Sequence, residues 1–194
     1  MKKLKKQIEK HLIGKKILLL FLLTNLIYAF MLIITIPKTM TFSNGLKLLD
    51  MMPTGYDSDY INALFKALGD NGRYVYLYNQ IPIDMIYPLF FGITYCLILA
   101  YFLNKLNNLK SSFFYLCLLP LIAGLFDYME NIGIITMLIN YPNNSQNLMK
   151  SANLFTIIKS MTTTVYFLCL IIILIILGIK TLNRKKTSAN KELS

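Results

Sequence analysis

Residues 113–139 read FFYLCLLPLIAGLFDYMENIGIITMLI, and this stretch decides the fold class of the chain. It is almost entirely apolar, yet it contains two carboxylates, Asp127 and Glu130. A helix of about 20 residues, rising ~1.5 Å per residue, crosses the ~30 Å hydrocarbon core of a bilayer. The stretch therefore predicts a membrane-spanning helix. A carboxylate in such a helix costs roughly 2.5–3.5 kcal/mol on insertion scales, so we expect both to face the protein interior and to serve a purpose.

Three more blocks of the same kind occur along the chain. The four predicted spans cover about 17–36, 81–103, 113–139 and 154–179. Hydrophobic residues make up 56% of the sequence, above the ~45–50% typical of soluble domains. We therefore predict an all-α, polytopic membrane four-helix bundle. Its membrane domain covers 17–179, between a basic N-terminal segment, 1–16, and a basic tail, 180–194.

The net charge of +11 is unevenly distributed. The lysines before the first span are Lys2, Lys3, Lys5, Lys6, Lys10, Lys15 and Lys16. The basic residues after the last span are Lys180, Arg184, Lys185, Lys186 and Lys191. The loop between spans two and three adds Lys105 and Lys110, whereas the 37–80 loop balances basic with acidic residues. The positive-inside rule then predicts a cell (inner) membrane protein with both termini cytoplasmic and the 37–80 loop external.

The sequence argues against several other classes of protein. The positive charge comes without a nucleic-acid-binding motif, so we predict no nucleic-acid partner. The cysteines Cys96, Cys117 and Cys169 lie in different spans and form no C-x-x-C pair, so dithiol redox chemistry is not expected. The single histidine, His11, precedes the first span. Zinc or haem held by histidine inside the membrane is therefore excluded. Magnesium or another hard cation held by the carboxylates and Asn131 is a less favoured alternative, and we predict no cofactor and no metal site.

The external loop contains a predicted short amphipathic helix. Asp57 or Ser58 can cap it, it extends to about Leu68, and Gly69 stands at its C-terminal end. Its apolar face comprises Tyr60, Ile61, Leu64, Phe65 and Leu68. Such a helix would lie on the outer membrane surface or cap the bundle.

Polar residues inside the spans recur at helical spacing. These stripes comprise Asn25 and Tyr28 in span one, Asp84, Tyr87 and Tyr95 in span two, Asp127, Glu130 and Asn131 in span three, and Lys159 and Thr162 in span four. Residues three, four or seven apart share one face of a helix. Because lipid cannot satisfy polar groups, the stripes should converge inside the bundle.

We interpret the converging stripes as an acidic cavity in the outer half of the bilayer. Asp127 and Glu130 are the candidate catalytic acid and base, and the other stripe residues are candidate ligand contacts. Lys159 is expected to pair with Glu130 or Asp84, and Arg73 to reach a second acid. The favoured hypothesis is a protein that holds a lipid-like or small amphipathic ligand. The alternatives are an isomerase-like enzyme and a structural or accessory subunit that forms a homo-oligomer or meets a membrane partner.

One pattern across residues 53–140 supports a resemblance. It consists of Gly55-Tyr56, Leu68-Gly69-x-x-Gly72-Arg73-x-x-Tyr76, Asp84-x-x-Tyr87-Pro88 and Phe126-Asp127-x-x-Glu130-Asn131. The pattern resembles that of a group of uncharacterised small four-span membrane proteins, mostly bacterial. This resemblance implies the four-span architecture and no particular activity. The layout is also similar, in architecture only, to the four-span sterol isomerase and sigma-2 receptor group, which holds small hydrophobic ligands among intramembrane acids.

Overall fold

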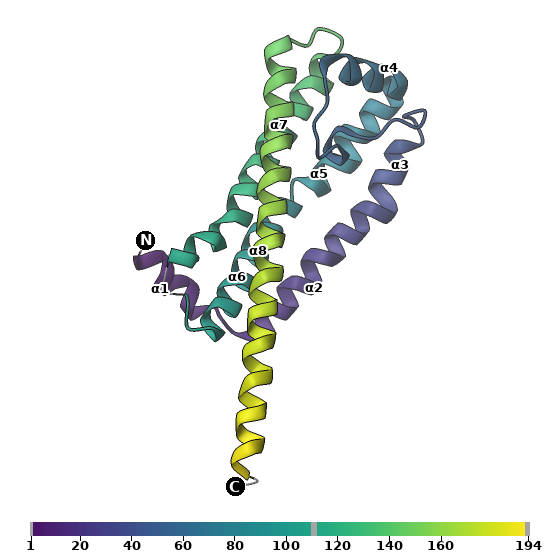
Figure 1. Ribbon diagram of the computed structural model, residues 1–194. Coiled ribbons are helices and arrows are strands. Elements are labelled where there is room, and N and C mark those ends of the chain that lie inside the picture. The colour runs from purple at the N-terminus through teal and green to yellow at the C-terminus, as the bar shows by residue number, and fades with distance from the viewer. Residues whose placement is uncertain (1, 110–111, 193–194) are drawn as a thin grey trace.

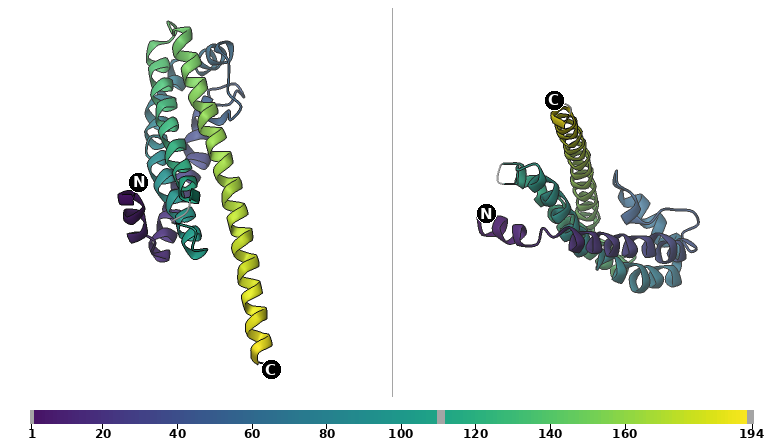
Figure 2. Two further views of the ribbon diagram at one scale, coloured as in Figure 1. Left: turned by 60° about the vertical axis from the view of Figure 1, so that its left-hand side comes forward. Right: turned by 90° about the horizontal axis from the view of Figure 1, so that it is seen from below.

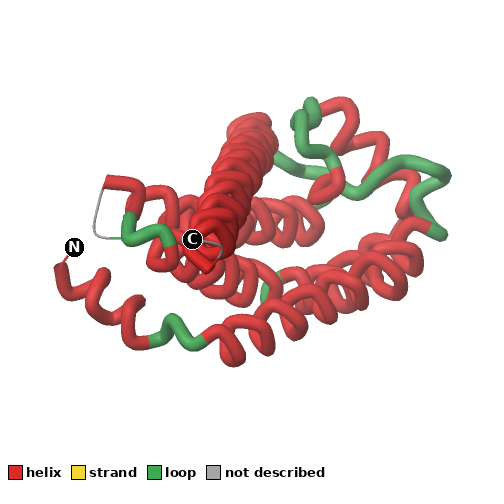
Figure 3. The backbone as a smooth tube through the Cα atoms, turned by 60° about the horizontal axis from the view of Figure 1, so that its bottom comes forward, coloured by secondary structure: helices red, strands yellow, loops and turns green. Residues whose placement is uncertain are grey.

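The computed structural model describes residues 2–109 and 112–192, with the side chains of 2–4, 6 and 184–192 left aside. Lys110 and the side chains of most residues in the basic C-terminal tail thus lie outside the described residues. The elements, in chain order, are α1 (Lys2–Lys10), α2 (Gly14–Phe30), η1 (Met31–Thr35), α3 (Ile36–Met40), η2 (Leu49–Met51), α4 (Ser58–Val75), η3 (Tyr76–Gln80), α5 (Ile81–Asp84), α6 (Tyr87–Lys105), η4 (Ser112–Leu118), α7 (Leu119–Asn140) and α8 (Gln146–Glu192). All described elements are helical, and short loops join them (Figure 3).

Four helical segments are long and apolar enough to cross a membrane. They are Gly14–Met40, Ser58–Lys105, Ser112–Asn140 and Gln146–Asn183. The prediction of an all-α bundle with four such helices is confirmed. Within the bundle α6 packs against α2 on one side and α7 on the other, and α7 packs along α8 (Figures 1 and 2). Helix α8 also contacts α6, so the four helices form a curved row with α2 and α8 at its two ends.

The connections lie at two opposite ends of the bundle. The end of α6, the start of α2 and the C-terminal part of α8 lie at one end (Figure 1). The segment from α3 to α4 and the turn between α7 and α8 lie at the other. The chain thus passes along the bundle four times, and the end of α6, which carries Lys105, and the C-terminal part of α8, which carries Lys180, lie towards the same end.

Helix α4 begins and bends where the sequence predicts. Asp57 Oδ1 accepts a hydrogen bond from the Tyr60 N–H over 2.8 Å, which caps the helix. Gly69 has φ +60° and interrupts the helical backbone, a conformation that glycine adopts without steric cost. The chain then continues as helix through η3 and α5, so span two, predicted to start near Ile81, forms one long helical segment with α4, Ser58–Lys105. In the sequence, the tyrosines and prolines of this stretch indicate an interfacial segment and an irregular start of the helix.

Two wide helical turns precede prolines and face each other. The π-turn η1 leads into α3, whose second residue is Pro37, and the π-turn η3 leads into α5, whose second residue is Pro82. Proline lacks an N–H and its ring crowds the preceding turn, which favours a locally widened helix. Thr35 Oγ1 donates a hydrogen bond to Gln80 Oε1 and so joins the two turns.

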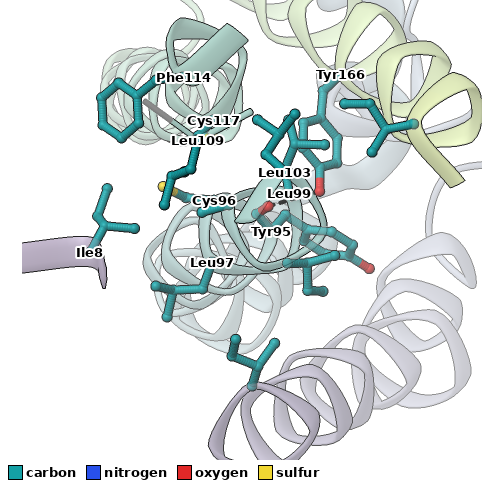
Figure 4. Close-up of a cluster of buried hydrophobic side chains, with 14 of the residues drawn as sticks. Ile8, Tyr95, Cys96, Leu97, Leu99, Leu103, Leu109, Phe114, Cys117 and Tyr166 are labelled. Carbon is teal, nitrogen blue, oxygen red and sulfur yellow. Dashed lines mark hydrogen bonds between the residues drawn. The ribbon is translucent and has the colours of Figure 1, made fainter. Parts of the chain in front are cut away.

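The inner core cluster forms around α6. Leu99 and Leu103 are buried, as are Phe114 and Cys117 of η4 on one side and Tyr166 of α8 on the other (Figure 4). The Tyr166 hydroxyl donates to the Tyr95 carbonyl over 2.8 Å, which ties α8 to α6. This cluster extends along α6 from Phe91 to Leu103 and fixes the helices that carry the polar residues.

The close packing of α6 on α7 gives a first testable prediction. A Cβ at Gly124 would lie 2.8 Å from the backbone carbonyl oxygen of Pro88. We expect Gly124→Ala to lower the free energy of unfolding by about 1–3 kcal/mol, because the two helix backbones must separate. Gly178→Ala is the control, since nothing lies within 4 Å of its added Cβ. Thermal unfolding in detergent measures both, and equal stability of the two variants would contradict the packing described.

Candidate functional site

A cavity of about 450 Å³ lies between the first and last long helices. Its walls come from Tyr28 and Leu32 on one side and from Lys159 and Thr163 of α8 on the other. Further lining residues come from the segment between α3 and α4 and from α5, α6 and α7: Asp50, Met51, Pro53, Asp84, Tyr87, Phe91, Ala123 and Asp127. Three carboxylates thus face one cavity, and Lys159 is the only cation among its described lining residues.

Lys159 is the centre of the charged network. Its Nζ lies 3.2 Å from Asp127 Oδ1 and also pairs with Glu130 Oε2. Asp127 and Glu130 stand three residues apart on α7, so one ammonium group reaches both. The expected pairing of Lys159 with Glu130 is confirmed, and the lysine holds Asp127 at the cavity wall.

Glu130 lies behind the cavity. It is fully buried, it is not among the lining residues, and its Oε1 accepts a hydrogen bond of 2.8 Å from the Thr156 hydroxyl. The Thr156 and Tyr56 hydroxyls lie 3.0 Å apart, which extends the network to the loop before α4. Burial, followed by the neighbouring Glu130 charge, raises the pKa of Tyr56, so this hydroxyl stays protonated. Glu130, which the sequence predicted as a catalytic partner of Asp127, is thus engaged by Lys159 and Thr156 outside the cavity.

The loop that carries Tyr56 lies closely against α8. The Tyr56 N–H donates to Asn153 Oδ1 over 2.9 Å. Gly55 has φ +90°, and a Cβ there would lie 2.3 Å from the same oxygen. Only glycine therefore allows this approach, which accounts for the Gly55-Tyr56 pair noted in the sequence.

Asp84 lines the cavity without a donor for one of its oxygens. Asp84 is 4% exposed, and none of the described residues donates a hydrogen bond to its Oδ2. Asn131, one turn beyond Asp127, is fully buried, and its amide nitrogen and oxygen likewise have no partner in the described part of the chain. Buried polar groups are normally hydrogen-bonded, so both positions call for a water or a ligand.

Asp50 belongs to the site although the sequence analysis placed it in the external loop. Its Oδ1 accepts from the Tyr76 hydroxyl over 3.0 Å and its Oδ2 from Gln80 Nε2 over 3.2 Å. These bonds hold the short helix η2, whose residues Asp50 and Met51 line the cavity. The sequence shows polar side chains, Tyr76 and Gln80, just before span two. It does not show that Asp50 is the acid to which they donate hydrogen bonds.

Aromatic rings form the wall nearest α2. Tyr28 stacks on Tyr87 with ring centroids 5.4 Å apart, and Tyr87 lies 5.7 Å from Phe91. Tyr28 is 42% exposed and Leu32 43% exposed, so the cavity reaches the side of the bundle between α2 and α8. Pro53, another lining residue, is exposed too.

Several predicted site residues lie elsewhere. Tyr95 belongs to the inner core cluster, Asn25 donates to the Phe21 carbonyl over 2.7 Å, and Thr162 donates to the Ile158 carbonyl over 2.7 Å. None of these three, nor Asn131, lines the cavity. The expectation that Arg73 reaches an intramembrane acid was wrong.

Arg73 is fully engaged outside the cavity. Its guanidinium pairs with Asp70, donates to the Phe65 carbonyl over 2.7 Å and lies 4.4 Å from the ring centroid of Tyr141. Its charge therefore leaves the acidic excess of the cavity unchanged.

Comparison of the chain with protein-family models, curated proteins and solved structures gave no match. Among the described residues, no three histidine, cysteine, aspartate or glutamate side chains are arranged to hold a metal ion. The site is therefore interpreted from its own geometry.

Proposed function

We propose that this protein is a multi-pass protein of the cell (inner) membrane that holds a lipid-like or small amphipathic ligand in the cavity between α2 and α8. The observation that carries the proposal is the combination of polar and apolar walls in one space. Asp84, Asp127 and Lys159 provide the polar part, and Tyr28 and Leu32 provide an apolar exit at the side of the bundle. An amphiphile matches both parts.

The size of the cavity supports the same proposal. Its volume of about 450 Å³ falls within the ~300–1,000 Å³ of typical small-molecule sites. A space of that size accepts a head group and the first part of a chain, while the rest of the chain can pass between α2 and α8. Membrane lipid is then both the surroundings of the protein and the source or route of its ligand.

A second candidate function is acid–base catalysis on the same ligand. The unpartnered Oδ2 of Asp84 favours it, because a general acid or base needs a free position facing the substrate. The acid–base pair would then be Asp84 and Asp127, since Glu130 is engaged by Lys159 and Thr156. Conversion of the bound amphiphile, followed by mass spectrometry, separates the two functions.

Filling the cavity tests the proposal. We expect Thr163→Trp to reduce the amphiphile that co-purifies with the full chain by at least tenfold, because the indole occupies the cavity next to Lys159. Thr181→Trp, at an exposed position of the same helix, is the control and should retain the wild-type amount. Native mass spectrometry of detergent-released protein gives the measurement. Equal ligand content in the two variants, or a stoichiometric protein partner in place of a ligand, would contradict the proposal.

The orientation in the membrane is tested by labelling. A cysteine replacing the exposed Lys47 should react with a membrane-impermeant maleimide added to intact cells, and a cysteine replacing the exposed Lys180 should react only after permeabilisation. The expectation follows from the basic residues at the end of the bundle that carries Lys105 and Lys180. The parent chain, whose three native cysteines lie within the long helices, gives the baseline. The reverse labelling pattern would overturn the orientation.

A further inference from the structure

The charges of the cavity do not balance. Asp50, Asp84 and Asp127 line the cavity together with Lys159, and Glu130 pairs with the same lysine from behind it. Lys159 is engaged by Asp127 and Glu130, and Asp50 is engaged by the neutral donors Tyr76 and Gln80. Asp84 is left as the acid whose Oδ2 receives no donor from the described residues.

Asp84 is the carboxyl group of the cavity that a cationic ligand would stabilise most. It is 4% exposed and lines the cavity, so its carboxyl group is largely removed from bulk water. Burying a carboxylate is unfavourable unless it is paired, and hydrogen bonds between ionised partners are the strongest available. A ligand that brings an N–H-bearing cation would therefore satisfy the unpartnered oxygen and reduce the negative charge together.

The aromatic rings next to Asp84 can bind the same N–H-bearing cation. Tyr87 is three residues from Asp84, and its ring lies between those of Tyr28 and Phe91. The faces of aromatic rings carry partial negative charge and attract ammonium groups. The exposed edges of Tyr28 and Leu32 then lead from this wall to the side of the bundle, where an alkyl chain can pass.

We propose that the ligand of this cavity is an amphiphile with a primary ammonium head on an apolar chain. The head donates to Asp84 and lies against Tyr87 and Tyr28, and the chain leaves between α2 and α8. This inference rests on the proposed function, because it names the chemical class of the ligand held there.

Matched single-chain probes test the inference on the full chain in detergent. We expect dodecylamine, at a pH where it is protonated, to bind at least tenfold tighter than dodecanol or dodecyl phosphate, measured by calorimetry. Asp84→Asn should weaken dodecylamine about tenfold and leave dodecanol unchanged, because an amide carries no charge to pair with the head. Asp59→Asn, the same change at an exposed site on α4, should alter neither affinity.

A second variant covers the case in which Asp84→Asn does not fold. Tyr28→Leu changes a residue that is 42% exposed, and it should weaken dodecylamine about two- to fivefold while leaving dodecanol unchanged. Nanodiscs made with an ethanolamine-headed or a choline-headed phospholipid identify the source of the head. Competition by the ethanolamine lipid alone makes the bilayer the source, and competition by neither makes it a free amine.

The outcomes separate the two proposals. If dodecanol or dodecyl phosphate binds as tightly as dodecylamine, and Thr163→Trp abolishes that binding, the ammonium inference is overturned and the ligand-holding function stands. If Thr163→Trp changes the binding of no probe, the proposed function itself fails. Unchanged dodecylamine affinity in folded Asp84→Asn would also overturn the inference.

Discussion

Replacing Lys159 by methionine is expected to lower the free energy of unfolding by about 3–5 kcal/mol, the loss typical when one partner of a buried ion pair is removed. Methionine keeps the volume and the unbranched chain, so packing changes little. What changes is the environment of Asp127 and Glu130, which are 7% and 0% exposed and lose their common cation. Thermal or denaturant unfolding in detergent, followed by circular dichroism, measures the difference.

The control for this variant is another lysine of the same helix. Lys150 is exposed on α8, and Lys150→Met should change stability by less than about 0.5 kcal/mol, as most surface substitutions do. If Lys159→Met were as stable as Lys150→Met, the ion pairs would contribute nothing to the bundle. The intramembrane charges would then have to be retained for ligand binding alone.

The spacing of polar residues in the spans predicted the centre of the site. Asp84, Asp127 and Lys159 fall on inward stripes because lipid cannot satisfy them, and the structure brings all three to one cavity. The expectation that every polar stripe residue lines the cavity was wrong for Tyr95 and Thr162, because an aromatic ring can pack in an apolar core and a hydroxyl can donate to its own helix. A tyrosine packs in a core, and a threonine hydroxyl bonds to the carbonyl four residues earlier in its own helix.

Asp50 and Glu130 show what helical spacing leaves undetermined. Asp50 reaches the cavity because the loop after α3 folds back and the Tyr76 and Gln80 side chains hold it, a long-range contact that no local pattern encodes. Glu130 shares a stripe with Asp127, yet one turn further along α7 it meets Thr156 and not the open space. The direction of a side chain followed from periodicity, but its depth relative to the cavity depended on how α7 and α8 pack.

Neutralising both α7 acids should have an effect far larger than the sum of the single changes. Asp127→Asn leaves Lys159 paired with Glu130, and Glu130→Gln leaves it paired with Asp127, so each single variant should lose only about 1 kcal/mol. The double variant leaves the ammonium group without either of the carboxylates that it pairs with, and we expect a loss of about 3–5 kcal/mol. Unfolding of the parent, both single variants and the double variant forms a complete double-mutant cycle.

Adding Lys159→Met to the double variant supplies the decisive comparison. The triple variant carries no charge in this network, and replacing a buried ion pair by neutral groups of similar shape is often neutral or stabilising. We therefore expect the triple variant to regain most of the stability lost by the double variant. Additive losses, or a triple variant no more stable than the double, would show that the acids act independently of Lys159. If the triple variant is stable yet retains no amphiphile, the charges serve the ligand and not the fold, which is the outcome expected of a binding site.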